Sequence, residues 1–281
     1  MVRFHRAPSP VASAPWHPVS VISDGARDGG GPQVPAADQT LRILAYLARQ
    51  RGPVAARTLS EGLGIPRSSV YHLLAAMAAH GFVVHLPGDR RWGLGTAAFE
   101  LAGGYARQQP LARLGHPLIA RLADRLGESA QLAVMTGRDV LYIVEERAPR
   151  RPALVSDVGV RLPAHLTATG RAMLAALPRE QVRALYPDAA AFADRTGRGP
   201  RNPRELREVL QQARHDGYAS EDGEVTLGFR SVAAVVCDHA DWPVAAIAVT
   251  WPADTDVGRT PAALASAVGA TAAELRRRLY G

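Results

Sequence analysis

Hydroxyl, imidazole and guanidinium side chains gather in a short stretch that begins directly after Pro66. The stretch contains Arg67, Ser68, Ser69, Tyr71 and His72, and the pair Arg90 and Arg91 follows a little further along the chain. Side chains of these types hydrogen-bond to phosphate oxygens and to the edges of bases in a DNA groove. We therefore predict DNA contacts here, against the alternative that these residues form a solvated helix face and a polar turn. Arg57 belongs to the same predicted set.

The elements that must position these residues follow from apolar spacing and from turn residues. Spacing of three and four residues predicts a helix from Leu41 to Ala48, with Asp38 as its cap and Gly52 and Pro53 after its end. A short helix containing Leu59 and Leu63 stops at Gly64, which suits a left-handed turn. Pro66 then begins a second helix that Gly81 ends, with one buried stripe: Val70, Leu73, Leu74 and Met77. Strands over 82–86 and 91–94, joined by 87–90, complete a winged helix-turn-helix over residues 38–94.

The charge of the chain is distributed as this interpretation requires. All 33 basic residues are arginine, the chain has no lysine, and its net charge is +7. Residues 38–108 hold eight arginines and four carboxylates, whereas residues 111–281 hold 22 arginines and 20 carboxylates. The excess of positive charge in the first segment favours phosphate binding. The absence of lysine excludes a Schiff-base lysine, a P-loop, a kinase catalytic lysine and a Ser–Lys hydrolase.

Composition and cysteine content restrict the class of protein. A length of 281 residues with 47% hydrophobic and 21% charged residues is typical of a soluble protein of about two domains. The single cysteine, Cys237, excludes an internal disulfide framework and a multi-cysteine metal site. Residues 1–37 are rich in proline and glycine and are expected to be a disordered arm. We find no apolar run of membrane length and no apolar core of a secretory signal, and we expect a cytoplasmic protein without membrane association.

Four sequence segments resemble the IclR family of transcriptional regulators. They are LSEGLGIPRSSVYHLL (59–74), RLPAHLTATGRAML (161–174), HDGYASEDGEVTLGFRSVAAV (215–235) and PVAAIAVTWP (243–252). The resemblance spans about residues 38–280 and implies a ligand-responsive regulator that binds double-stranded operator DNA as a homodimer or homotetramer. The family usually has arginine where this chain has His72, so its operator sequence cannot be taken from relatives. Whether the protein represses or activates stays open.

The second half of the chain is expected to be an α+β domain over residues 110–281. A linker helix is predicted over 95–109, with Phe99, Leu101 and Ala102 on one side, and by resemblance it helps dimerisation. Alternation and apolar runs predict strands over 130–135, 139–145, 153–156, 232–237 and 244–251. Helices are predicted over 111–126, 168–176, 179–186, 203–216 and 261–279, with a loose loop over 188–201. By resemblance this domain is GAF-like.

The resemblance also implies an effector cavity in this domain. Its lining, carried over position by position, is Leu154, Leu162, Ala168, Thr169, Glu221, Phe229, Ser231, Ala248 and Thr250. Leu154 and Leu162 would form an apolar floor, and the backbone N–H groups of Ala168 and Thr169 would face an anion or a carbonyl group. Several family members have a hydroxyl group where Ala248 stands, which favours a bulkier or more apolar effector, such as an organic acid or an aromatic compound. The alternative is that these residues fill a core.

Three short hydroxyl side chains of this set are expected to converge from a helix start and two strands. They are Thr169, Ser231 and Thr250. A buried hydroxyl group without a partner costs ~1–3 kcal/mol, so three together would indicate a ligand or water that satisfies them.

An enzymatic function is the alternative hypothesis, with the C-terminal domain as a small-molecule hydrolase and the winged helix as an accessory module. His165, Ser231 and Asp157 could be combined into a triad, but the chain has no Gly-x-Ser-x-Gly nucleophile elbow. His215 and Asp216 lie near Glu221 in sequence and leave weak metal binding open, and Cys237 is expected to be a buried, inert thiol. A DNA-packaging protein, the third class, would not explain the motifs of the cavity. We expect no catalytic residue, metal or cofactor.

Overall fold

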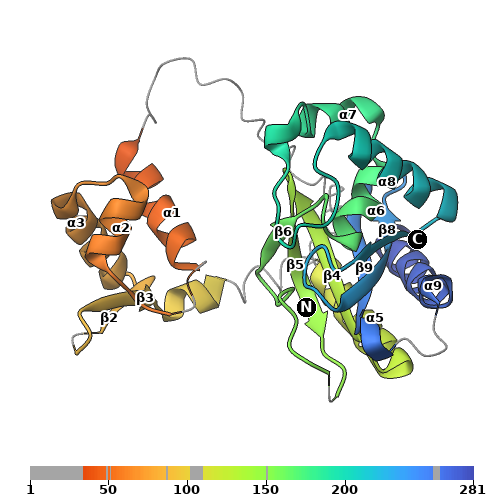
Figure 1. Cartoon of the computed structure of the whole chain (residues 1–281). Helices are drawn as coiled ribbons and strands as arrows, with labels where there is room; N and C mark the ends of the chain where they lie inside the picture. The colour runs from red at the N-terminus through yellow and green to blue at the C-terminus, as the bar shows by residue number, and fades with distance from the viewer. Residues whose placement is uncertain are drawn as a thin grey trace, which may run out of the picture.

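The computed structural model describes residues 34–48, 50, 52–86, 88–101, 110–149, 151–255 and 260–281. Most of the predicted arm, residues 1–33, lies outside the described residues, and so do residues 102–109 of the predicted linker helix. Helical structure is described over 96–101. The remaining elements form two groups along the chain, one before and one after this helix (Figure 1).

The N-terminal group is a winged helix-turn-helix. Its elements are α1 (Pro35–Ala48), β1 (Val54–Ala55), α2 (Ala56–Leu63), α3 (Arg67–Ala79), β2 (Val83–Leu86) and β3 (Arg91–Leu94). The three helices enclose an apolar cluster: Ile43, Leu47, Leu59, Val70, Leu74 and Met77 are buried in it. The strands form an antiparallel sheet in the order β1-β3-β2. β1, which pairs through Val54 and Ala55, was not predicted because two residues carry too little pattern.

Two glycines end the helices of the helix-turn-helix as predicted. Gly64 takes a left-handed conformation, with φ of 66°, at the end of α2. After α3, Gly81 has φ of 71°, and the N–H groups of Gly81 and Phe82 donate to the carbonyl oxygens of Ala78 and Met77. This pair of hydrogen bonds is a Schellman motif. The predicted start of the first helix was wrong, because α1 begins at Pro35, where the fixed φ of proline suits a first helical position, and Asp38 lies inside the helix.

The C-terminal group is an α+β unit built on one antiparallel sheet. Its helices are α5 (Pro110–Leu126), α6 (Ala168–Ala176), α7 (Arg179–Leu185), α8 (Pro203–Asp216) and α9 (Pro261–Tyr280), with short 3-10 turns at Ala189–Ala191 and Ala253–Thr255. Its strands are β4 (Ser129–Thr136), β5 (Asp139–Glu146), β6 (Arg161–Pro163), β7 (Ala219–Asp222), β8 (Phe229–Cys237) and β9 (Pro243–Pro252). The strand order is β6-β5-β4-β9-β8-β7.

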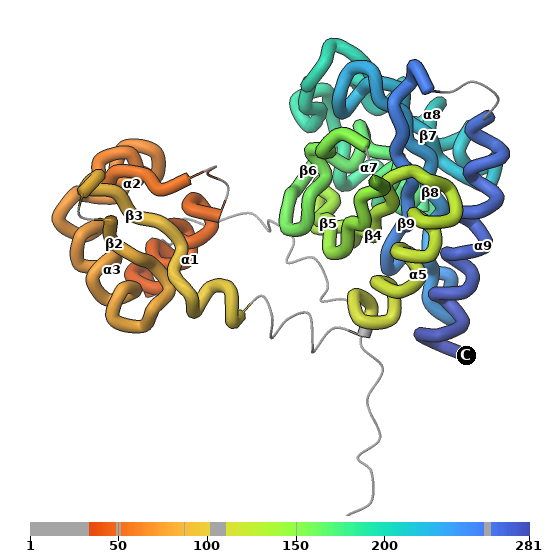
Figure 2. Tube along the Cα trace, turned by 90° about the horizontal axis from the view of Figure 1, so that it is seen from below, coloured from red at the N-terminus to blue at the C-terminus, as the bar shows by residue number. Residues whose placement is uncertain are grey.

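Helices cover both faces of this sheet (Figures 1 and 2). α5 and α9 pack together on one face, where Leu122, Leu132 and Val268 belong to one apolar cluster. α6 contacts β8 and β9 on the other face and packs against α8, and its cluster contains Ala133, Met173 and Leu206. Alternate residues of β4, β8 and β9 therefore face different cores.

Two predictions for the irregular segments were wrong. Residues 153–156 form no strand; the edge position beside β5 is taken by β6, whose Leu162 pairs with Val140. Residues 188–201 are not a loose loop, because Thr196 Oγ1 donates to the Gly223 carbonyl oxygen at 2.8 Å. Gly199 has φ of 92° and lies so close to Leu166 that a Cβ would be 2.8 Å from its side chain. The glycines here permit close packing as well as turns.

Among the described residues, no helix is both long and apolar enough to cross a membrane.

Candidate functional site

The first candidate site is the exposed face of α3. Arg67, Ser68, Tyr71 and His72 are exposed, and Ser69 is half-buried. Val70, Leu74 and Met77 point into the core on the opposite side of the helix. Residues four apart lie on one side of a helix, so Arg67 with Tyr71 and Ser68 with His72 form one polar surface. This surface presents a guanidinium group, hydroxyl groups and an imidazole ring, which can donate to phosphates and read base edges.

The arginines of α2 and of the wing are placed differently from one another. Arg57 donates from Nε to Glu61 Oε1 at 2.6 Å, so its guanidinium is held by an exposed ion pair. Arg90 is exposed in the turn between β2 and β3 and has a positive φ of 50°. Arg91 donates from Nη1 to the Pro53 carbonyl oxygen at 3.3 Å and therefore reaches back across β1. Arg90 is the residue of this pair that is free to extend from the wing.

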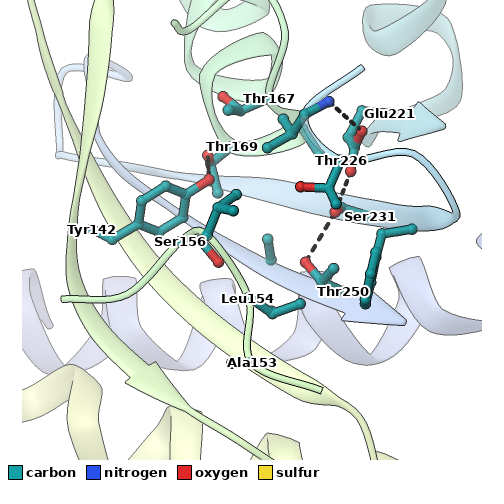
Figure 3. A pocket seen from close by; sticks show the side chains of 15 residues that line it. Tyr142, Ala153, Leu154, Ser156, Thr167, Thr169, Glu221, Thr226, Ser231 and Thr250 are labelled. Atoms are coloured by element: carbon teal, nitrogen blue, oxygen red, sulfur yellow. Dashed lines mark hydrogen bonds between the residues drawn. The ribbon is translucent and has the colours of Figure 1, made fainter. Parts of the chain in front are cut away.

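The second candidate site is a cavity between the sheet and the start of α6 (Figure 3). It encloses about 480 Å³ of space without protein atoms, part of it open to solvent. Its lining consists of Tyr142, Ala153, Leu154, Val155, Ser156, Thr167, Ala168, Thr169, Glu221, Val225, Thr226, Phe229, Ser231, Ala248 and Thr250. We call this space the cavity.

The structure brings eight of the nine predicted cavity residues to this space. The exception is Leu162, whose predicted place on an apolar floor is wrong. Leu162 is the central residue of β6 and is buried in the apolar cluster with Val140 and Met173. The prediction placed Leu154 and Leu162 together on one apolar surface. In the structure Leu154 lines the cavity, whereas Leu162 does not.

A chain of hydrogen bonds crosses the cavity floor from β7 to β4. Ser231 Oγ donates to Glu221 Oε1 at 2.6 Å and lies 2.9 Å from Thr250 Oγ1. Thr250 Oγ1 donates in turn to Gln131 Oε1 at 3.3 Å. These four side chains come from four strands, β7, β8, β9 and β4. The hydroxyl groups of Ser231 and Thr250 are thus satisfied by the protein, whereas we had expected a ligand or water to satisfy them.

The Glu221 carboxyl is buried beside the cavity. Burial raises its pKa to about 7, and the hydrogen bond from Ser231 opposes this rise. The backbone N–H groups of Glu224 and Val225 point to its second oxygen, Oε2, at 3.2 and 3.5 Å. Near neutral pH this carboxyl therefore exchanges between its neutral and its charged form.

The start of α6 forms the opposite wall. Thr167 caps the helix by accepting from the Gly170 N–H group at 3.0 Å. Thr169, the third predicted hydroxyl, lies 3.4 Å from the hydroxyl group of Tyr142 rather than bonding to Ser231 or Thr250. Burial raises the pKa of Tyr142 to about 12, so this phenol is neutral. Sequence reasoning missed Tyr142, because its position on the cavity depends on the pairing of β5.

A buried arginine holds the two walls together. Arg171, on α6, donates to the carbonyl oxygens of His165 and Ser220 at 2.9 and 2.7 Å and forms an ion pair with Glu224 at 2.9 Å. Its guanidinium thereby joins the loop before α6 to β7 and to the turn after it. Sequence reasoning missed this role, although an arginine inside the small, apolar helix Ala168–Ala176 was a usable signal.

The groups considered for catalysis are separated in the structure. His165 Nε2 lies 3.0 Å from the Ala193 carbonyl oxygen, and its ring packs against Tyr186 and Phe192. Burial lowers its pKa. Ser231 bonds to Glu221 instead. Cys237 lies at the end of β8 and is half-buried rather than buried as expected. In the described part of the chain, no group of three His, Cys, Asp or Glu side chains is arranged to hold a metal ion.

Both halves of the chain match family models. Residues 36–87 match the model described as IclR helix-turn-helix domain, and residues 103–277 match the model described as Bacterial transcriptional regulator IclR C-terminal. The chain is 31% identical over 222 residues to the Transcriptional repressor IclR of Escherichia coli (strain K12). The matched region covers 78% of this chain and 81% of that repressor.

Solved structures share the fold. An IclR transcriptional regulator from Alicyclobacillus acidocaldarius matches with a TM-score of 0.78 at 22% identity, over 88% of this chain and 99% of that one. An IclR homolog from Microbacterium hydrocarbonoxydans, complexed with 4-hydroxybenzoate, matches with a TM-score of 0.74 at 21% identity. That match covers 87% of this chain and 98% of the other.

Proposed function

We propose that this chain, which belongs to the IclR family of transcriptional regulators, binds its operator through α3 and the wing and changes its operator affinity when a small molecule fills the cavity. The observation that carries the proposal is the cavity itself, where eight predicted residues from separate segments meet around a chain of polar groups. The chain is a DNA-binding transcriptional regulator by its family, and the residues that perform each task are the proposed part.

For DNA binding, we assign base contacts to α3 and phosphate contacts to the arginines around it. Arg67, Ser68, Tyr71 and His72 form the exposed surface that fits a major groove, with Ser69 at its margin. Arg90 and Arg91 on the wing and Arg57 on α2 supply positive charge for the backbone. Arg57 must exchange its ion pair with Glu61 for a phosphate, which costs little for an exposed pair.

For effector binding, the start of α6 and the polar floor face each other across the cavity. The N–H groups at the first turn of a helix favour a carboxylate or a carbonyl group, here at Ala168 and Thr169. Leu154, Phe229 and Ala248 supply apolar surface, and Glu221, Ser231 and Thr250 supply polar groups. A mostly apolar organic acid or aromatic compound fits this lining. A neutral Glu221 carboxyl would tolerate the carboxylate of an effector beside it, whereas a charged Glu221 carboxylate would repel that group.

Effector and DNA must influence each other equally. If the effector changes the affinity for the operator by some factor, the operator changes the affinity for the effector by the same factor, typically ~1–3 kcal/mol of coupling.

In this proposal the protein acts in the cytoplasm as a homodimer or homotetramer, and it uses no catalytic residue, metal or cofactor. Exposed apolar side chains on helix 96–101 support self-association: Phe99 is 82% and Leu101 67% exposed.

The experiment is an operator titration in the presence of small molecules. The DNA upstream of the protein's own gene is the first target, and mobility shift gives its affinity with and without a panel of organic acids. We expect specific binding that at least one acid changes. A protein that ignores this DNA and converts a small molecule into product would instead support the enzymatic alternative.

A further inference from the structure

Three buried polar atoms beside the cavity have no hydrogen-bond partner among the described residues. They are Ser129 Oγ, Gln131 Nε2 and Glu145 Oε1. Ser129 and Gln131 are each 1% exposed, and the Glu145 side chain is 5% exposed. A buried donor or acceptor without a partner costs ~1–3 kcal/mol, so a group of three calls for a partner that is not part of the chain.

Strand register places these atoms together on the cavity side of the sheet. Ser129 and Gln131 are two apart on β4 and share a face. Gln131 stands opposite Ala248 on one side and Glu145 on the other, and Ser129 stands opposite Thr250. Because Ala248 and Thr250 line the cavity, Gln131 lies directly beside its floor.

The hydrogen bond from Thr250 determines which end of the Gln131 amide group is available to a further partner. Thr250 Oγ1 holds Gln131 Oε1 at 3.3 Å, so the amide nitrogen Nε2 is the end left over. This nitrogen is a donor, while Glu145 Oε1, on the neighbouring strand, is an acceptor. The only contact recorded for this oxygen in the described residues is the guanidinium of Arg147, whose Nε is 4.0 Å away. A hydroxyl group can accept from one atom and donate to the other, as a water molecule can.

The segment 151–160 borders both the cavity and this region. It is tied at one end by Arg151 to Glu128 and at the other by the Gly159 N–H group, which donates to the Tyr142 carbonyl oxygen at 2.9 Å. Between these ties, Leu154 and Ser156 line the cavity. The Asp157 carboxyl approaches Glu145, and burial, together with this carboxyl, raises the pKa of Glu145 to about 7. A protonated Glu145 adds a further donor beside this segment.

We propose that Ser129, Gln131 and Glu145, which border the cavity but are not among its lining residues, form a subsite that receives a hydroxyl group of the effector. The inference rests on the proposed effector function and deepens it, because it makes the effector a hydroxylated acid rather than any acid of suitable size. A site built to bond a hydroxyl group discriminates strongly against the analogue that lacks it, because its own polar groups are then left without partners.

The test compares matched pairs of acids on the full-length protein by isothermal titration. The probes are benzoate with 3-hydroxybenzoate and 4-hydroxybenzoate, and pentanoate with 5-hydroxypentanoate. Gln131→Met removes the amide and keeps the length of the side chain. Gln181→Met makes the same chemical change at an exposed position of α7 and is the matched control. Glu145→Met is a second variant that removes both carboxyl oxygens from the same subsite, should Gln131→Met fold poorly.

We expect wild-type protein and Gln181→Met to bind a hydroxylated acid about tenfold or more tightly than its unsubstituted partner. Gln131→Met and Glu145→Met should bind both members of that pair equally. A wild-type protein without such a preference, whether both acids bind or neither does, overturns the proposal. So does a Gln131→Met or Glu145→Met protein that folds and keeps the preference. Failure of the regulatory function would appear separately, as operator DNA that is bound or released without regard to any acid.

Discussion

The two candidate sites are built in opposite ways. The proposed DNA-binding surface comes from residues 57–91, and its central part is one face of the single helix α3. The cavity draws on residues from Tyr142 to Thr250, and its polar floor needs one side chain from each of four strands. Its side chains are buried and bonded to one another, whereas those of α3 are exposed.

This difference determines what a substitution does in each region. An exposed residue of α3 can lose its function without disturbing the fold, because few neighbours depend on it. A buried residue of the cavity has a structural and a binding role at once, and its replacement affects both. The variants below use this contrast, from the largest expected effect to the smallest.

Arg171→Met should cause the largest loss of stability. The substitution removes a guanidinium that donates to two carbonyl oxygens and pairs with Glu224, and it leaves that carboxyl buried without its cation. Breaking a buried pair in this way costs about 3–5 kcal/mol. Urea unfolding followed by circular dichroism measures the change. Arg204→Met is the control, because its ion pair with Glu208 is exposed and should contribute about 1 kcal/mol or less. Equal effects of the two substitutions would contradict the bracing role of Arg171.

Ser231→Leu should abolish the effector response while DNA binding persists. The added bulk occupies the cavity floor, and we expect effector affinity to fall by ~2 kcal/mol or more, which is about thirtyfold. Operator release by the effector, compared between wild type and variant, gives the result, with the fold checked by circular dichroism. Ser231→Ala separates bulk from the lost hydroxyl group, since it keeps the space open. An unchanged response in a folded Ser231→Leu protein would place the effector elsewhere.

Arg67→Ala and Tyr71→Ala should each weaken specific operator binding by ~1–3 kcal/mol if the side chain reads a base. Stability should stay close to that of wild type, because both residues are exposed. Arg113→Ala, which removes an exposed arginine from α5, controls for the loss of charge alone. Mobility-shift titrations against operator and unrelated DNA check the prediction. The proposed docking of α3 is wrong if these variants and Arg90→Ala all keep wild-type affinity.

The stability of the C-terminal half should decrease between about pH 4.5 and 7. The pKa of Glu221 is raised to about 7 in the folded protein from an ordinary value of 4.5, so the folded state holds a proton that the unfolded state releases. This favourable contribution is complete below pH 4.5 and is lost as the pH rises through 7, with a slope of at most ~1.4 kcal/mol per pH unit. Denaturation of wild type and Glu221→Gln across this range measures it. A variant with the same slope as wild type would show that Glu221 is not responsible.

Arg90→Ala should have the smallest effect, spread evenly over DNA sequences. Loss of one phosphate contact lowers affinity for operator and unrelated DNA alike and reduces the salt dependence by ~1 in slope. Titrations at several salt concentrations give the slope. Arg91→Ala, whose guanidinium bonds to the Pro53 carbonyl oxygen, should change the slope less. A sequence-specific loss in Arg90→Ala would instead indicate a base contact by the wing.

Predictions from the sequence succeeded where the signal is local. Gly64 and Gly81 mark the ends of two helices because positive φ is needed there, and both have it. The helices over 168–176 and 203–216 have the predicted bounds, since caps and apolar spacing lie within each segment. The start of α1 was misplaced because Pro35 was counted with the proline-rich arm that precedes it.

Predictions failed where a residue's place depends on distant partners. The sequence pattern of residues 153–156 predicts a strand, but β6 occupies the edge of the sheet beside β5. Residues 153–156 line the cavity instead. Leu162 was expected on the cavity and lies in the core for the same reason. The bonds of Arg171 to Ser220 and Glu224 span some fifty residues of chain, and no spacing rule links them.

The sequence by itself determined the winged helix, the family and the polar face of α3, because turn residues and helical periodicity act over a few residues. It also identified eight of the residues that line the cavity, by resemblance. Only the tertiary structure decided that the hydroxyl oxygens of Ser231 and Thr250 lie 2.9 Å apart and that Tyr142 meets Thr169. It also decided that Gln131 lies beside the floor, with an amide nitrogen that has no partner among the described residues. These outcomes depend on strand order and register, which are set by the packing of the whole sheet against helices on both faces.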